Sequence, residues 1–126
     1  MKSKANSLTG AILNYIRMTG GHSERVNNIA RQVTTKTGAK VFIPSANFKG
    51  TADIHACKKV QLVEAVGKSF VMGGYVYGQF VAIEVKIGKD KQSEAQAYYQ
   101  ECVEGAGGVY IIASDIDQFL REWEAI

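Results

Sequence analysis

Apolar residues recur at helical spacing in three parts of the chain, residues 8–19, 95–106 and 116–123. In each stretch an apolar side chain follows every third or fourth position, so one helix face is apolar and the other polar. A serine able to cap the first turn precedes each stretch, and a glycine pair follows the first two. The serines are Ser7, Ser93 and Ser114, and the pairs are Gly20-Gly21 and Gly107-Gly108. The pattern predicts three amphipathic helices.

Alternating side chains predict strands between these helices. The clearest strand covers residues 75–87, where one face is wholly apolar and the other carries two charged residues. The apolar face is Val81, Ile83, Val85 and Ile87, and the other is Phe80, Ala82, Glu84 and Lys86. Shorter strands are predicted at 25–27, 40–44 and 53–57. A last strand at 109–113 follows one helix length later, which predicts a β-α-β crossover with parallel strands.

The stretch between residues 57 and 75 is harder to assign. Residues 60–66 fit either a strand or a helix, and glycines at 67 and 73–74 predict a loop. An extra hairpin is the simplest content of residues 60–74. As a long β-extension it would serve as a substrate arm or as a dimerisation element.

Residues 1–126 are predicted to form one α/β domain with a mixed central sheet flanked by helices. The chain has 46% hydrophobic residues and, with 15 Lys and Arg against 12 Asp and Glu, a net charge of +3, which is compatible with a polyanionic partner. Cys57 and Cys102 lack zinc-type spacing, so we expect free thiols and a cytoplasmic location. No stretch is typical of a secretion signal or of a membrane span, so no membrane partner is expected.

Three residues form the main candidate for chemistry. Glu84 and Lys86 share one face of a largely apolar strand, and Asp53 begins another strand. If the two strands are neighbours, the carboxylates converge on an oxygen-rich site suited to Mg²⁺ or Mn²⁺. In the alternative interpretation, Glu84 and Lys86 form an exposed ion pair and Asp53 only caps a turn.

Three sequence blocks extend this pattern: GTADI at residues 50–54, IEVK at 83–86 and KDKQSEAQ at 89–96. In this order they resemble the motifs of the PD-(D/E)XK nuclease superfamily, and more narrowly those of its VRR-NUC family. In that family one strand supplies an aspartate, the following strand supplies E-x-K, and a helix contributes a glutamine. The resemblance implies a restriction-endonuclease-like core.

By this resemblance, Asp53 and Glu84 would ligate the metal ion together with the Val85 carbonyl, and Lys86 would position the attacking water. Gln96 would face the cleft and hydrogen-bond water, substrate phosphate or Lys86, although its spacing alone also fits an ordinary polar residue at the helix flank. Four cations are candidates for phosphate contacts, and Glu24 is a candidate additional acid. The cations are Arg25, Lys49, Lys89 and Lys91.

The resulting hypothesis is a Mg²⁺- or Mn²⁺-dependent nuclease that hydrolyses DNA, with structured or branched DNA as its substrate. A homodimer is expected because cutting both strands symmetrically needs two active sites. Two alternatives stay open: a catalytically inactive nucleic-acid-binding module of the same fold, and a protein-interaction domain. His55 is interpreted as a packed structural residue, and Gly67-Lys68-Ser69 lacks the leading glycine of a P-loop.

Overall fold

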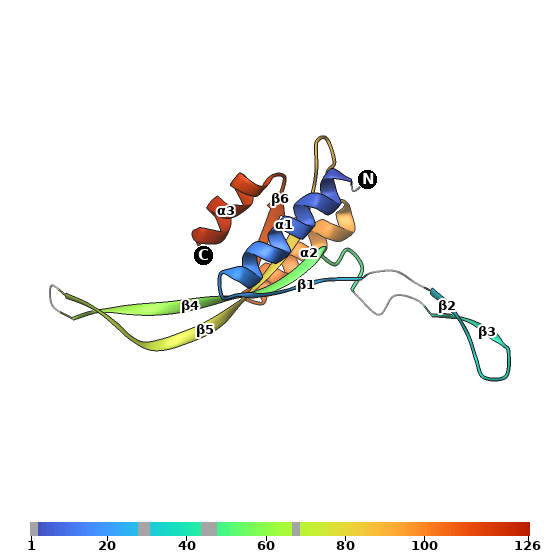
Figure 1. Cartoon of the computed structure of the whole chain (residues 1–126), viewed down its shortest axis with the longest axis horizontal. Coiled ribbons are helices and arrows are strands. Elements are labelled where there is room, and N and C mark those ends of the chain that lie inside the picture. The colour runs from blue at the N-terminus through green and yellow to red at the C-terminus, as the bar shows by residue number, and fades with distance from the viewer. Residues whose placement is uncertain (1–2, 28–30, 44–47, 67–68) are drawn as a thin grey trace.

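The computed structural model describes residues 3–27, 31–43, 48–66 and 69–126. Three helices and six strands occur within these ranges (Figure 1). In chain order they are α1 (Lys4–Met18), β1 (His22–Arg25), β2 (Arg31–Thr34), β3 (Lys40–Ile43), β4 (Ile54–Val66), β5 (Ser69–Val85), α2 (Glu94–Gly105), β6 (Val109–Ala113) and α3 (Ile116–Glu124).

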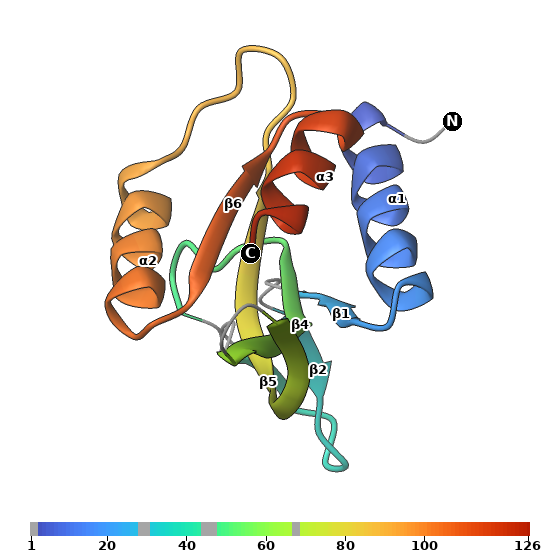
Figure 2. The same ribbon diagram turned by 90° about the vertical axis from the view of Figure 1, so that its left-hand side faces the viewer.

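A mixed four-stranded sheet with the order β1-β4-β5-β6 forms the centre of the molecule. Strand β6 runs parallel to β5, whereas the β1–β4 and β4–β5 pairs are antiparallel. Helix α2 lies on one face of this sheet, and α1 and α3 lie on the other (Figure 2). The predicted mixed α/β architecture and the parallel crossover through α2 are therefore confirmed.

Strand β5 is buried on both faces where it crosses the centre of the sheet. Val81 and Ile83 are fully buried in the main core beneath α1 and α3, as the sequence predicted. On the α2 face, Ala82 is fully buried beside Tyr99 and Val103 of the helix. A polar side chain that this central part of β5 directs towards α2 is therefore largely shielded from water.

Residues 58–66 and 69–79 continue β4 and β5 as a hairpin that extends beyond the helices (Figure 1). This confirms the extra hairpin predicted for residues 60–74 and assigns residues 60–66 to a strand. The loop expected between Gly67 and Gly73-Gly74 is wrong from residue 69 onward, because residues 69–74 lie within β5. The two glycines stand where the β4–β5 pairing shifts register, an irregularity at which glycine is common. Gly67 lies outside the described residues.

A second antiparallel hairpin, β2–β3, forms a sheet of its own. The strand predicted at 40–44 corresponds to β3, with Pro44 outside the described residues. Strand β2 was missed because three of its four residues are polar, so the sequence shows no clear alternation there. The strand predicted at 25–27 is wrong in position: β1 ends at Arg25, and its pairing with β4 begins three residues earlier, at His22.

The predicted helices are correct, but two of the predicted caps are wrong. Ser3 caps α1 by accepting a hydrogen bond from the Asn6 amide, so Ser7 lies inside the helix. Asp115, instead of Ser114, caps α3 by accepting from the Gln118 amide. In both cases several neighbouring residues have side chains able to cap, and the local sequence does not choose between them. The cap of α2 is the predicted Ser93.

Within the described ranges, no helix is long and apolar enough to cross a membrane.

Candidate active site

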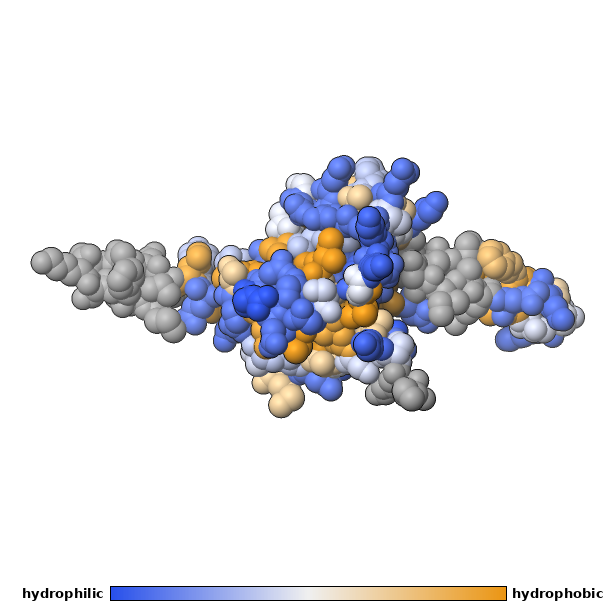
Figure 3. Space-filling view, turned by 90° about the horizontal axis from the view of Figure 1, so that it is seen from above, coloured by the Kyte–Doolittle hydropathy of each residue, from blue (hydrophilic) through white to orange (hydrophobic). Residues whose placement is uncertain are grey.

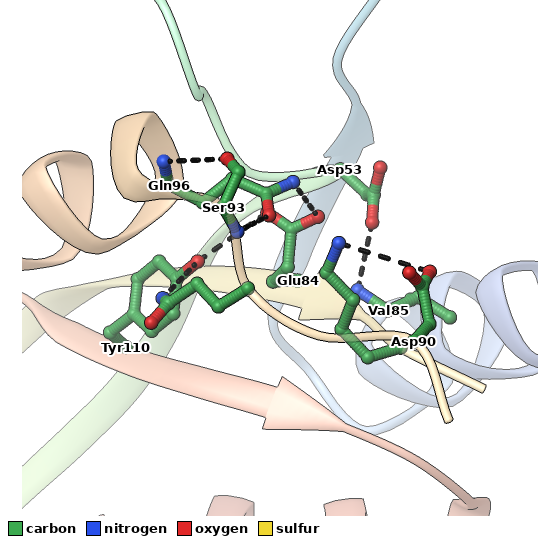
Figure 4. A network of polar contacts seen from close by, with 9 residues as sticks. Asp53, Glu84, Val85, Asp90, Ser93, Gln96 and Tyr110 are labelled. Carbon is green, nitrogen blue, oxygen red and sulfur yellow. Dashed lines mark hydrogen bonds and ion pairs between the residues drawn. The ribbon is translucent and has the colours of Figure 1, made fainter. Parts of the chain in front are cut away.

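The sheet brings Asp53 and Glu84 together at one end of β4 and β5. Ile54 pairs with Ile83 in the antiparallel ladder, so Asp53, just before β4, lies beside Glu84 near the end of β5. Asp53 is fixed there by its Oδ2 atom, which accepts a hydrogen bond of 2.8 Å from the Val85 amide. Figure 4 shows the two carboxylates beside each other at this end of the sheet. The neighbouring strands that the sequence hypothesis required are present.

Glu84 is a buried carboxyl group, with only 3% of the residue exposed. Gln96 Nε2 donates a hydrogen bond of 3.0 Å to one of its oxygens, and the Tyr110 hydroxyl donates a longer one of 3.4 Å to the other. Burial, the nearby Asp53 charge and a side-chain hydrogen bond with Asp53 raise the pKa of Glu84 to about 8, against the opposing effect of Lys86. Two neighbouring carboxylates repel each other, so the arrangement is most stable when one of them is protonated or when both bind a cation.

Gln96 performs two roles at the start of α2. Its Oε1 atom accepts a hydrogen bond of 2.8 Å from the Ser93 amide, and Ser93 in turn caps the Gln96 amide, which completes a capping box. Its Nε2 atom donates one hydrogen bond to Glu84 (Figure 4). The helix cap therefore fixes the orientation of the amide. Gln96 does face the site, and the partner that the structure gives it is Glu84.

Gly50 holds the Asp53 loop against the start of α2. Its φ of +83° lies in the left-handed region, and a Cβ atom there would lie 2.4 Å from the carbonyl carbon and oxygen of Ala95. Only glycine allows this approach between two backbones. The glycine of the GTADI block thus sets the distance between Asp53 and Gln96.

Lys86 follows directly after the end of β5, two residues beyond Glu84. Its side chain is 13% exposed and reaches Asp90, with the Nζ atom 3.8 Å from a carboxylate oxygen. Asp90 is itself 63% exposed, so this pair is weak and Lys86 remains free to bind an anion. No pattern in the sequence singles out Asp90 as a partner of Lys86.

Aromatic residues form the wall beside the carboxylates. Tyr99 of α2 packs near Tyr110 of β6, and its hydroxyl lies 3.0 Å from His55 Nε2. Burial lowers the pKa of His55, against a smaller opposing effect of Glu24, and burial also raises the pKa of Tyr110. These contacts agree with the interpretation of His55 as a packed residue. Tyr110 was missed because a lone tyrosine in a short strand has no motif around it.

The predicted cations surround the site without entering it. Arg25 donates a hydrogen bond of 3.0 Å to Asn6 Oδ1, at the end of β1 beside Ile54. The three lysines are exposed in the two loops that border the site: Lys49, Lys89 and Lys91. Glu24 is also exposed; its carboxylate lies 3.2 Å from His22 Nε2, and its strand position is opposite His55, two residues from Asp53.

The donor set of the site suits a hard divalent cation. Carboxylate oxygens of Asp53 and Glu84 are the ligands that Mg²⁺ and Mn²⁺ prefer. The N–H and C=O of one strand residue point to the same side, so the Val85 carbonyl is directed to the same edge of β5 as its amide, which contacts Asp53. Among the described residues there is no group of three or more His, Cys, Asp or Glu side chains able to hold a metal. A backbone oxygen and water would have to complete the coordination.

Comparison of the chain with protein-family models, with curated proteins and with solved structures gives no match. Function has to be inferred from the side chains and their geometry.

Proposed function

We propose that the protein is a divalent-metal-dependent nuclease that hydrolyses DNA phosphodiester bonds. The observation that carries the proposal is the convergence of Asp53, Glu84, Lys86 and Gln96 at one end of the sheet, with Glu84 buried beside a second carboxylate. Burying a carboxyl group next to another is unfavourable unless a cation or proton is bound there. A structural role alone does not explain that arrangement.

In this proposal Asp53, Glu84 and the Val85 carbonyl hold Mg²⁺ or Mn²⁺. The ion, when bound, neutralises phosphate charge and lowers the pKa of a water molecule. The amide of Val85 keeps Asp53 in position, and Gln96 orients Glu84 through its hydrogen bond. The ammonium group of Lys86 orients the attacking water and offsets charge that develops on the phosphate oxygens.

The proposed fold is a restriction-endonuclease-like core, on the grounds that the motif blocks occupy neighbouring strands and the start of the following helix. Structured or branched DNA is the proposed substrate class.

The proposed assembly is a homodimer, because cutting two strands requires two active sites. Size-exclusion chromatography with light scattering tests this assembly. Cys57 and Cys102 are free and exposed, which fits the proposed cytoplasmic location.

A cleavage assay on labelled DNA tests the proposed function. Single strands, duplex, flap and four-way junction are incubated with Mg²⁺, Mn²⁺ or EDTA, using wild type and Glu84→Gln. Glu101→Gln makes the same chemical change on an exposed position of α2 and is the matched control. We expect cleavage only with metal, a loss of about 100-fold or more in Glu84→Gln, and wild-type activity in the control.

Full activity in Glu84→Gln, or in EDTA, would overturn the assignment of the site. DNA binding with no cleavage of any substrate under either metal would instead favour the inactive nucleic-acid-binding module.

A further inference from the structure

The β2–β3 hairpin has little support from the core. It pairs from Arg31↔Ile43 to Thr34↔Lys40, and Figure 1 shows it standing away from the helices, on the side opposite the outer part of β4–β5. Its turn is ordered by a hydrogen bond of 2.8 Å from the Thr35 amide to the Ala39 carbonyl. A two-stranded hairpin by itself is marginally stable in water. Because the hairpin packs little against the core, its surface is available to a partner.

Both ends of the segment that contains this hairpin are fixed at the candidate active site. On the way out, the Val26 amide donates a hydrogen bond of 2.8 Å to the Asp53 carbonyl. On the way back, the Phe48 ring stacks on Tyr98 of α2 with the ring centres 5.8 Å apart, and Gly50 lies against Ala95. The chain therefore leaves the site at Val26 and returns to it at Phe48. A ligand long enough to extend past the site on this side would meet the hairpin.

The hairpin carries charge of one sign only. Residues 31–43 include Arg31, Lys36 and Lys40 and contain no Asp or Glu. Lys36 in the turn and Lys40 in β3 are exposed, and three threonines and a glutamine supply neutral hydrogen-bonding groups. Phe42 is also exposed, at 68%. Figure 3 shows hydrophilic and apolar side chains together on this arm. Cations, hydroxyl groups and an exposed aromatic ring suit a polyanion whose bases offer hydrogen-bonding edges and apolar faces.

We propose that the β2–β3 hairpin is a DNA-binding arm that contacts the duplex beside the bond held at the candidate active site. The substrate class rests on the proposed function. Lys36 and Lys40 contact the phosphate backbone, and a two-stranded ribbon has the width that the major groove admits. The arm supplies affinity for DNA and takes no part in the hydrolysis itself.

Binding to DNA in EDTA tests the arm separately from the chemistry. Fluorescence anisotropy of a labelled duplex and of a labelled four-way junction is measured over a range of salt concentrations with wild type and Lys36→Glu/Lys40→Glu. Arg121→Glu, which reverses one exposed charge on α3, is the control for net charge, and each single lysine variant is compared with it. We expect the double variant to lose about tenfold or more in affinity and its salt slope to fall by about two. The control should keep both.

Thermal unfolding of each variant shows whether the core is intact, which we expect because the hairpin lies outside it. Unchanged affinity and salt slope in the folded double variant would overturn the proposal, as would an equal loss in Arg121→Glu. A change in oligomeric state with DNA affinity retained would also overturn it and make the hairpin a protein contact. Wild type that binds DNA through these lysines but never cleaves it would refute the proposed nuclease and leave the arm standing.

Discussion

Replacing Glu84 by Gln tests the electrostatics of the site without substrate or metal. Burial and the neighbouring Asp53 raise the pKa of Glu84 from 4.5 to about 8. Glutamine has nearly the same shape, keeps an oxygen for the Gln96 amide and does not ionise. The variant removes the pH dependence of this one group and leaves the packing around it nearly unchanged.

The sign of the pH dependence of stability follows from the fact that Glu84 binds its proton more tightly in the folded chain than in the unfolded chain. The pKa of Glu84 is higher in the folded chain, so its contribution to stability is complete below 4.5 and is lost as the pH rises through about 8. Each pKa unit corresponds to about 1.4 kcal/mol. The free energy of unfolding of wild type should therefore fall relative to Glu84→Gln by about 3 to 5 kcal/mol between about pH 5 and about pH 9.

Urea unfolding in EDTA measures this difference. Trp123 is the single tryptophan and is 3% exposed, so its fluorescence reports the unfolding of the core. Glu101→Gln controls for the change in net charge. The reasoning is refuted if the stabilities of wild type and Glu84→Gln differ by a constant amount, within about 0.5 kcal/mol, over this pH range.

Two further substitutions test how the site is built. Gly50→Ala should destabilise the protein by about 2 to 4 kcal/mol in urea unfolding, because its Cβ atom would meet the Ala95 backbone. The control is Gly107→Ala, which has a similar φ of +90° but open space around it, and it should lower the free energy of unfolding by only about 1 kcal/mol. Equal losses would contradict the close approach as the cause. Lys86→Met should lower turnover in the cleavage assay by about 100-fold while Mn²⁺ binding by calorimetry persists, and loss of Mn²⁺ binding would show that Lys86 supports the metal site instead.

Local signals explain why the site could be found from the sequence. Glu84 and Lys86 stand in a strand pattern that alternates clearly, and Asp53 begins another strand. Gln96 was assigned to the site by the motif resemblance, because its spacing alone also fits an ordinary polar residue at the helix flank. Register then follows from burial, since a shift of one residue would expose Ile83. Each of these side chains lies at or beside one end of its own strand or helix, and the fold places those ends next to one another.

Other features depend on contacts between distant parts of the chain. The hydrogen bond between Tyr110 and Glu84 joins β6 to β5, and nothing next to Tyr110 in the sequence indicates it. Gly73-Gly74 likewise lie within β5 at the point where its pairing with β4 shifts register, between Val63↔Met72 and Gln61↔Val76, and glycine by itself predicts a loop there. Three of the four residues of β2 are polar, so its sequence carries no clear alternation to detect.

The two hairpins and the site are separable parts of one chain. Asp53 and Glu84 lie at one end of the β4–β5 pair, and the outer residues of that pair can be removed at Val60↔Tyr77, beyond the ties that Lys58 makes to the carbonyls of Trp123 and Ile126. Replacing residues 61–76 by a short turn would keep every contact described for the carboxylates. Hairpin length is thus free to vary during evolution, or by design, without altering the residues at the site. The length of the β4–β5 hairpin and the residues of the candidate active site can therefore change independently in this fold.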